Sequence, residues 1–347
     1  MMKKLLITGG TGFLGCHVAR LALKQGYDVT LYDIAPLTAE DLKDKVTVVQ
    51  ADVRDQESIT KALKGIDYVV HAAAALPIQR TKEKIFSTNI YGTEKVLLAA
   101  KKQKIKRLVY ISSTAVYGVP KVWPETEEAP LDPIGYYGES KIAGENLCRA
   151  YEKEGLQCNI IRPKTFLGVE RLGVFQIWFD AIYTGKPVVI LGDGNNKYQL
   201  LWVGDIADAI LKALTAKVHG ETFNIGAKNF GTWNEDLGAT IKFAKSKSRI
   251  LGLPVKPSQI ILALFDKLNL SPIAEWHYRT LPVDSYVSTE KAEKLLGWKA
   301  QKSDKDLLIE SYDWYAKHRE EIKNRKGMTH RVGWNFGILD VIERLLP

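Results

Sequence analysis

Six short apolar runs, each separated from the next by a longer helical pattern, dominate the first half of the chain. Their apolar character is continuous rather than alternating, which is typical of strands buried on both faces. Strands joined through helices in this way form a parallel sheet, so the pattern predicts a doubly wound α/β domain. The six runs lie at residues 4–8, 28–33, 46–50, 68–72, 107–112 and 158–162.

The first run leads directly into a glycine-rich turn, LLITGGTGFLG, that opens a helix. Gly9, Gly12 and Gly15 would let the backbone turn sharply and approach a pyrophosphate, and the helix N-terminus offers free N–H groups. Glycines are common in any turn, but this one stands between a strand and a helix, which favours a dinucleotide site of the Rossmann type. The other residues of this turn that we expect to border the cofactor are Thr11, Phe13 and Leu14.

Two acidic residues at the ends of later strands bear on the identity of the dinucleotide. Asp33 ends the second strand, close to where such folds keep an acid for the adenosine ribose hydroxyls. A carboxylate there repels a 2′-phosphate, so we predict NAD rather than NADP, although an ordinary turn residue explains Asp33 equally well. Asp52 and Val53 follow the third strand, where an adenine amino group could be held, and a plain turn aspartate is the alternative.

A tyrosine and a lysine stand four positions apart in YGESK, so Tyr137 and Lys141 would share one face of a helix. A free tyrosine has a pKa near 10, too high for acid–base work at neutral pH. We expect the Lys141 ammonium, with an oxidised nicotinamide ring, to favour the phenolate, so that Tyr137 can act as general acid and base. Lys141 could also bind the nicotinamide ribose. Two solvated residues on a helix are the alternative.

The regular alternation of strand-like runs and helical segments ends at about residue 165. This change predicts a second, smaller domain of mixed α/β structure that binds the substrate. We assign residues 1–165, and a return of the chain at about 200–226, to the Rossmann domain. Residues 166–199 and 227–325 form the predicted substrate domain. Residues 326–347 form a basic segment followed by an amphipathic helix, which could dock on an anionic membrane surface or, as we favour, pack on the domain or a dimer partner.

Composition narrows the classes of partner. The net charge is +9, but the lysines are dispersed, so we expect no nucleic acid; an anionic substrate or membrane surface explains the charge equally well. Cys16, Cys148 and Cys158 have no CxxC spacing, which argues against a zinc site and favours a reducing cytoplasm. No apolar stretch approaches the roughly 18 residues of a spanning helix. We expect a cytoplasmic protein without metal, at most peripheral to the membrane.

Seven motifs together resemble the extended short-chain dehydrogenase/reductase superfamily, and within it the NAD-dependent epimerase/dehydratase family. They are TGGTGFLG (8–15), HAAA (71–74), NIYGT (89–93), ISSTAVYG (111–118), YGESK (137–141), IRP (161–163) and WVGDIADAI (202–210). The resemblance implies that Ser113 is the catalytic serine beside the tyrosine and lysine. It also implies that Asn89 braces the sheet near the cofactor, that Ala72 and Ala73 border it, and that the protein is a homodimer.

Departures from the family pattern concern the substrate. Dehydratases carry an Asp-Glu pair where Thr114 and Ala115 stand here, so we do not expect 4,6-dehydration. Thr165 replaces a usual asparagine. Tyr198 and the next residue, Gln199, replace a usual Arg-Asp, although a phenol cannot match a guanidinium fork on a diphosphate. The basic residues that could compensate are Lys164, Arg171 and Lys197, and the tentative substrate residues are Thr114, Lys164, Thr165 and Tyr198.

These observations leave three hypotheses. The leading one is an NAD-dependent epimerase that forms a transient ketone on a sugar carried by a nucleotide or lipid phosphate. The second is a dehydrogenase or reductase of a hydroxy-lipid, sterol-like or other apolar alcohol, with NAD or NADP. A scaffold without activity is the third, and an intact serine, tyrosine and lysine set argues against it.

Overall fold

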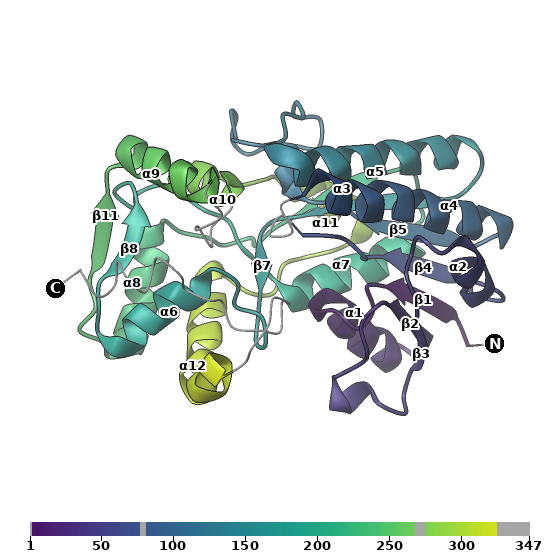
Figure 1. The fold of residues 1–347 in the computed structure, drawn as a ribbon, viewed down its shortest axis with the longest axis horizontal. Coiled ribbons are helices and arrows are strands. Elements are labelled where there is room, and N and C mark those ends of the chain that lie inside the picture. Colours follow the sequence, from purple (N-terminus) through teal and green to yellow (C-terminus); the bar gives the residue numbers. More distant parts are fainter. Residues whose placement is uncertain (1, 77–80, 268–274, 325–347) are drawn as a thin grey trace.

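The computed structural model describes residues 2–76, 81–267 and 275–324. Its centre is a parallel seven-stranded sheet with the order β10-β6-β5-β4-β1-β2-β3 (Figure 1). The direction of winding reverses between β1 and β4, and doubly wound folds bind their ligands at the carboxyl ends of such strands. The strands are β1 (Lys4–Thr8), β2 (Asp28–Asp33), β3 (Thr47–Gln50), β4 (Tyr68–His71), β5 (Arg107–Ile111), β6 (Cys158–Pro163) and β10 (Thr222–Ile225).

Helices cover both faces of this sheet, as the alternating pattern predicts. On one face α1 packs on α7, and on the other α4 packs between α2 and α5. Each layer is closed by its own core of buried, mostly aliphatic side chains. The helices are α1 (Phe13–Lys24), α2 (Gln56–Ala62), α3 (Lys82–Phe86), α4 (Thr93–Lys102), α5 (Gly135–Lys153) and α7 (Val203–Thr215).

A second region, on the left in Figure 1, has a separate core rich in aromatic side chains. Helix α12 packs against α6 and α8 there. Two short parallel pairs of strands, β8 with β11 and β7 with β9, complete the region. Its elements are β7 (Phe166–Leu167), α6 (Phe175–Thr184), β8 (Val188–Leu191), β9 (Leu201–Trp202), α8 (Trp233–Phe243), β11 (Ile250–Leu253), α9 (Val255–Lys267), α10 (Glu275–Thr280) and α12 (Asp304–Asn324).

Helix α11 (Glu290–Leu296) departs from the predicted division of the chain. It packs on β10 and α7 of the Rossmann domain rather than on the second region. Ala292 and Trp298 are fully buried in the core that α1 and α7 share, and the Trp298 indole donates to the Asp205 carbonyl at 2.9 Å. The predicted substrate segment 227–325 therefore contains a short return to the first domain, because the large indole finds both space and an acceptor there.

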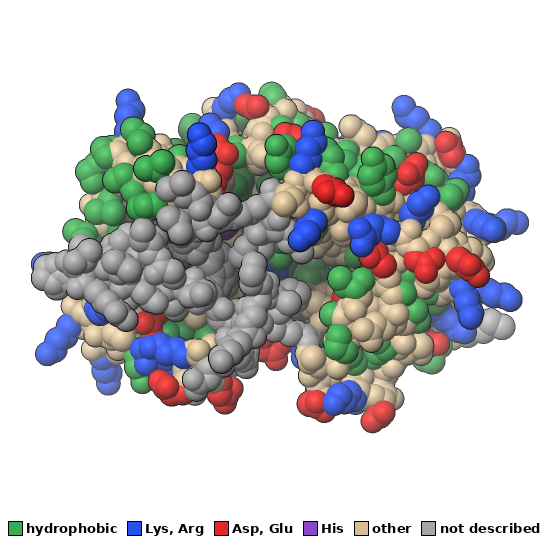
Figure 2. Space-filling view, in the orientation of Figure 1, with side chains coloured by type: hydrophobic (Ala, Val, Ile, Leu, Met, Phe, Trp, Pro, Cys, Tyr) green, Lys and Arg blue, Asp and Glu red, His purple; other side chains and the backbone are tan. Residues whose placement is uncertain are grey.

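Helix α9 presents apolar side chains to the surface. Ile260 is 72% exposed, and Ile261 and Leu264 are also more than half exposed. Figure 2 shows hydrophobic side chains gathered over this helix. Among the described residues, no helix is both long and apolar enough to cross a bilayer. The predicted terminal helix within 326–347 lies outside the described residues.

Candidate active site

The glycine-rich turn between β1 and α1 has no room for side chains. Gly9 has φ +67°, and a Cβ there would lie 2.8 Å from the Ala73 nitrogen and 2.9 Å from the Ala72 carbonyl carbon. A Cβ on Gly15 would lie 2.3 Å from the Gly9 oxygen. Gly12 stands at the start of α1 without any side-chain cap on the helix. The turn thus places bare backbone beside the first N–H groups of α1, a cradle that fits a pyrophosphate.

Asp33 ends β2 beside this turn, as predicted. Its carboxylate accepts hydrogen bonds from the Thr11 nitrogen at 3.1 Å and from the Ala35 nitrogen at 3.0 Å. The side chain is half-buried. Asp33 therefore holds the glycine turn against the end of β2, and its contact with the ribose stays a prediction.

Asp52 and Val53 lie at the end of β3, and their side chains are already engaged. The Asp52 carboxylate accepts from the Arg54 backbone nitrogen at 2.9 Å and from its Nε at 3.0 Å. Val53 is buried against Gly92, where a Cβ would come within 2.8 Å of it. An adenine amino group at Asp52 would have to share the carboxylate with Arg54, and this contact stays a prediction.

Asn89 connects the segment after β4 to α5, the helix that carries the predicted catalytic tyrosine. It lies in a π-helical turn, Ser87–Gly92, a geometry common at functional sites. Its Oδ1 accepts from the Ala75 nitrogen at 2.7 Å, and its Nδ2 donates to the Ser140 hydroxyl at 2.9 Å. Ser140 lies on α5 between the tyrosine and the lysine. These bonds tie the segment after β4 to α5, and the bracing of the sheet near the cofactor stays a prediction.

The three predicted catalytic residues meet where β5 ends and α5 begins. Ser113 follows β5, and its hydroxyl interacts with the phenol of Tyr137 in the first turn of α5. Lys141 lies one turn later, with its Nζ 5.7 Å from the centre of the Tyr137 ring. The Lys141 ammonium donates to the Ile111 carbonyl at 2.8 Å, which holds it at the end of β5.

A second cation, which helical spacing does not predict, also acts on Tyr137. Burial raises the pKa of Tyr137, and the positive charge of Arg171 and the hydrogen bond with Ser113 oppose that rise. Burial also lowers the pKa of Lys141 to about 8, against the influence of Glu145. The guanidinium of Arg171, from a loop far along the chain, thus adds a positive charge that favours the phenolate, and the part of Lys141 stays a prediction.

A buried ion pair beneath the site is the feature that the sequence reasoning missed. Glu145 and Arg162 are almost fully buried, and their side chains make two bonds of 2.8 and 2.6 Å. Glu145 also accepts from the Ser112 hydroxyl at 2.6 Å, and Arg162 donates to the Tyr117 hydroxyl at 2.7 Å. This network joins α5 to β5 and β6, so it fixes the helix of Tyr137 relative to the strand of Ser113. A glutamate eight residues after Tyr137, on the same helix, was the available signal.

The tentative substrate residues lie at the junction of the two regions. The Lys164 Nζ donates to the Ser285 hydroxyl at 2.7 Å, and Tyr198 stacks on Trp233 with ring centres 4.7 Å apart. Both Lys164 and Tyr198 are 2% exposed. Thr165 is half-buried and hydrogen-bonds Tyr198. Buried Thr114 donates to a backbone carbonyl of β6 at 3.3 Å. Lys164 and Tyr198 are therefore bound to protein partners, and their substrate role stays a prediction.

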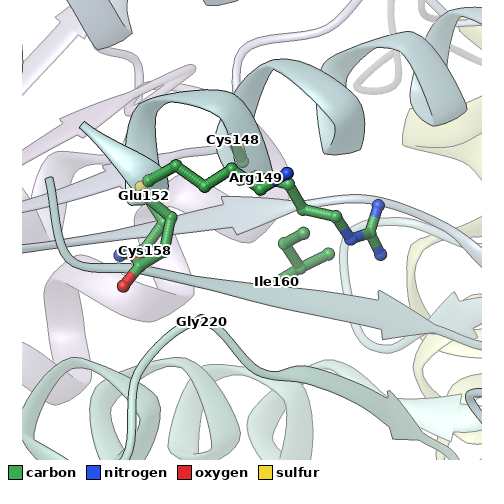
Figure 3. Close-up of a pocket in the computed structure, with 7 residues that line it drawn as sticks. Cys148, Arg149, Glu152, Cys158, Ile160 and Gly220 are labelled. Atoms are coloured by element: carbon green, nitrogen blue, oxygen red, sulfur yellow. Dashed lines mark hydrogen bonds between the residues drawn. The ribbon is translucent and has the colours of Figure 1, made fainter. Parts of the chain in front are cut away.

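A cavity of ≈ 210 Å³ opens at the other end of the sheet, behind α5 and the start of β6 (Figure 3). None of the predicted site residues lines it. Burial raises the pKa of the Cys148 thiol well above its usual range, which disfavours the reactive thiolate. The lining residues are Cys148, Arg149, Glu152, Lys153, Cys158, Ile160 and Gly220.

Residues 5–226 match the model of the NAD dependent epimerase/dehydratase family. The chain belongs to this family. The UDP-N-acetyl-alpha-D-glucosaminuronate decarboxylase of Bacillus cytotoxicus is 30% identical over 73% of this chain and 84% of its own length. UDP-glucose 4-epimerase 2 of Arabidopsis thaliana is 26% identical over 90% of this chain and 95% of its own length.

A solved structure of the same fold contains the cofactor. UDP-glucuronic acid 4-epimerase from Bacillus cereus, in complex with NAD, has a TM-score of 0.75 and 24% identity, over 90% of this chain and 99% of that chain. The likeness and the family confirm the predicted Rossmann-type α/β fold and NAD as cofactor. The glycine cradle and Asp33 are the parts of this chain that would hold it.

Proposed function

We propose that the protein is an NAD-dependent epimerase that acts through a transient ketone on a sugar carried by a nucleotide or lipid phosphate. The observation that carries the proposal is the meeting of Ser113, Tyr137 and Lys141 at the end of β5, on the side of the sheet where the glycine turn lies. Both relatives reported above are named for sugar nucleotides, one as a 4-epimerase.

Each residue of the set has a role that its contacts support. Ser113 would bind the reacting oxygen, because its hydroxyl already interacts with the Tyr137 phenol. Tyr137 would take the hydroxyl proton and later return it. Lys141, fixed on the Ile111 carbonyl, keeps a positive charge beside both groups. NAD, when bound, supplies the acceptor and donor of the hydride. After Ser113 come Thr114 and Ala115, so no carboxylate stands there for 4,6-dehydration.

A dehydrogenase or reductase of an apolar alcohol is the second candidate. Tyr198 and Gln199, in the positions of the usual Arg-Asp, are buried, and Gln199 bonds the Ala227 carbonyl at 2.7 Å. The chain thus offers no arginine there for a diphosphate. The exposed apolar face of α9 suits a protein that meets an apolar substrate or a membrane surface. Peripheral membrane contact, a cytoplasmic location and a homodimer stay predictions.

The first test is mass spectrometry of the nucleotide that the purified protein releases on denaturation. An epimerase regenerates its cofactor in every turnover and can keep it, so near-stoichiometric NAD is the expected result. An empty site that binds added NAD or NADP only weakly would contradict the epimerase and favour the dehydrogenase.

A further inference from the structure

The guanidinium of Arg171 is held in one place by its surroundings. Arg171 and Gly168 close a tight turn in which the Arg171 nitrogen donates to the Gly168 oxygen at 3.1 Å. The Arg171 Cζ lies 5.1 Å from the centre of the Phe166 ring and 5.6 Å from that of Phe13. The two rings are parallel, with centres 6.2 Å apart. Such stacking fixes the plane of a guanidinium and leaves its N–H edge available.

This guanidinium lies between the cofactor cradle and the catalytic phenol. Phe13 is the first residue of α1, directly after the glycine turn. Tyr137 and Arg171 are close enough for each charge to shift the other's protonation. Arg171 therefore stands at the reacting end of the site.

Arg171 has no carboxylate partner among residues 2–76, 81–267 and 275–324. Its neighbour Glu170 is exposed and faces Arg20 at 4.0 Å instead. The buried Arg162, by contrast, is paired with Glu145 at 2.6 Å. A half-buried guanidinium without an anion is costly to fold, and groups of this kind concentrate at functional sites.

Lys164, the other buried cation near the junction, does not offer the same opportunity. Its ammonium is bound to Ser285, and its charge faces Glu125. Both Glu125 and Lys164 are almost fully buried. An anion on the substrate would have to compete with Ser285 for this ammonium, whereas Arg171 needs no such exchange.

We propose that Arg171 binds the carboxylate of a sugar acid beside the carbon whose hydroxyl reacts with Tyr137. The guanidinium fork matches the two oxygens of a carboxylate and can bind both at once. The inference rests on the proposed function and names its substrate class. A phosphate presents the same oxygens, and the pyrophosphate of the cofactor is its other source. The free N–H groups at the start of α1 would bind that pyrophosphate, so the carboxylate is the better match for Arg171.

The test compares two probes that differ only at one carbon. UDP-glucuronic acid carries a carboxylate where UDP-glucose carries a hydroxymethyl group. Dissociation constants are measured by isothermal titration calorimetry on the NAD-loaded protein at fixed ionic strength. The same titrations are run on Arg171→Gln, on Arg171→Lys, and on Arg249→Gln, which removes an exposed arginine before β11 as the matched control.

We expect UDP-glucuronic acid to bind about 10- to 100-fold more tightly than UDP-glucose, as for a hydrogen-bonded charge pair. Arg171→Gln should abolish that preference, Arg171→Lys should retain part of it, and Arg249→Gln all of it. Equal affinities in the unmodified protein, or a preference that survives in Arg171→Gln, would overturn the inference. So would binding of neither sugar, or a variant that loses NAD affinity while keeping the preference, since the guanidinium would then serve the pyrophosphate.

These outcomes stay separate from the test of the proposed function. Release of near-stoichiometric NAD would support the epimerase even if neither sugar nucleotide binds, and the sugar-acid inference alone would then be wrong. A protein that binds UDP-glucuronic acid through Arg171 but releases no nucleotide would keep the inference and contradict the epimerase.

Discussion

Lys141 and Lys164 have nearly the same environment and, we argue, different roles. Each is almost fully buried, each has a pKa lowered to about 8 by burial, and each lies 5 to 6 Å from the centre of a tyrosine ring. Tyr137, beside Lys141, is half-buried and interacts with Ser113 at the end of β5, whereas Tyr198, beside Lys164, is 2% exposed. A lysine with a lowered pKa next to a tyrosine therefore does not by itself identify a catalytic centre. We expect the catalytic tyrosine to be the one whose phenol a ligand can reach.

The largest expected effect comes from the two tyrosines. Tyr137→Phe should lower kcat by about 10²- to 10⁴-fold, because it removes the group that moves the proton. It should leave NAD bound. The matched change Tyr198→Phe removes a phenol from the domain junction and should leave kcat within about threefold of the unmodified protein, with a small loss of stability of about 1 kcal/mol. Steady-state kinetics and urea unfolding measure both. A comparable fall of kcat in Tyr198→Phe would place the chemistry at the junction.

Substitutions of the two lysines should differ in their effect on kcat in the same way, although the effect is smaller than for the tyrosines. Lys141→Met should lower kcat by about 100-fold, because the charge beside Ser113 and Tyr137 is lost. Lys164→Met should leave kcat unchanged, since its ammonium bonds Ser285 within the junction. Replacing a buried charge by an apolar side chain of similar size is often neutral for stability, provided that the partner can be neutral. If Lys164→Met is the inactive variant, the contrast between the two sites fails.

The cofactor half of the molecule could be predicted from the sequence because its signals are local. Gly9, Gly15 and Asp33 each occupy a position that the backbone of one β-α-β unit dictates, and the strands lie within one or two residues of the predicted runs. The substrate half could not be predicted as well. Arg171 reaches Tyr137 from a turn more than thirty residues later, and Lys164 meets Ser285 across 121 positions. Such contacts depend on how two domains pack, which no periodicity encodes.

The titration of Glu125, which faces Lys164 at the junction of the two regions, gives a further contrast with the Lys141 site. Burial raises the pKa of Glu125 to about 7, and the charge of Lys164 only partly offsets this. Between pH 4.5 and 7 the folded protein then binds more protons than the unfolded chain, so stability falls as pH rises through that window, by up to about 1.4 kcal/mol per pH unit. Glu125→Gln should remove this loss of stability. The free energy of unfolding of the variant should therefore increase relative to that of the unmodified protein as pH rises.

Glu128→Gln is the control for this series, because Glu128 is exposed in the same loop. Its free energy of unfolding should run parallel to that of the unmodified protein from pH 4.5 to 7. Urea unfolding at each pH gives the comparison. Parallel curves for Glu125→Gln as well would mean that Glu125 is ionised throughout and that the junction is wetter than its burial indicates.

The smallest expected effect is a shift in the pH profile of kcat/KM when Arg171 is replaced. Arg171 opposes the burial that raises the pKa of Tyr137. Arg171→Met should therefore move the pH midpoint that Tyr137 contributes to the profile of kcat/KM upward, by roughly one unit. Arg249→Met should leave the midpoint in place. The position of the midpoint is independent of how tightly the substrate binds, so it reports the charge on the phenol even where the variant also weakens binding. An unmoved midpoint in Arg171→Met would leave Lys141 as the cation that tunes Tyr137, as the helical spacing first suggested.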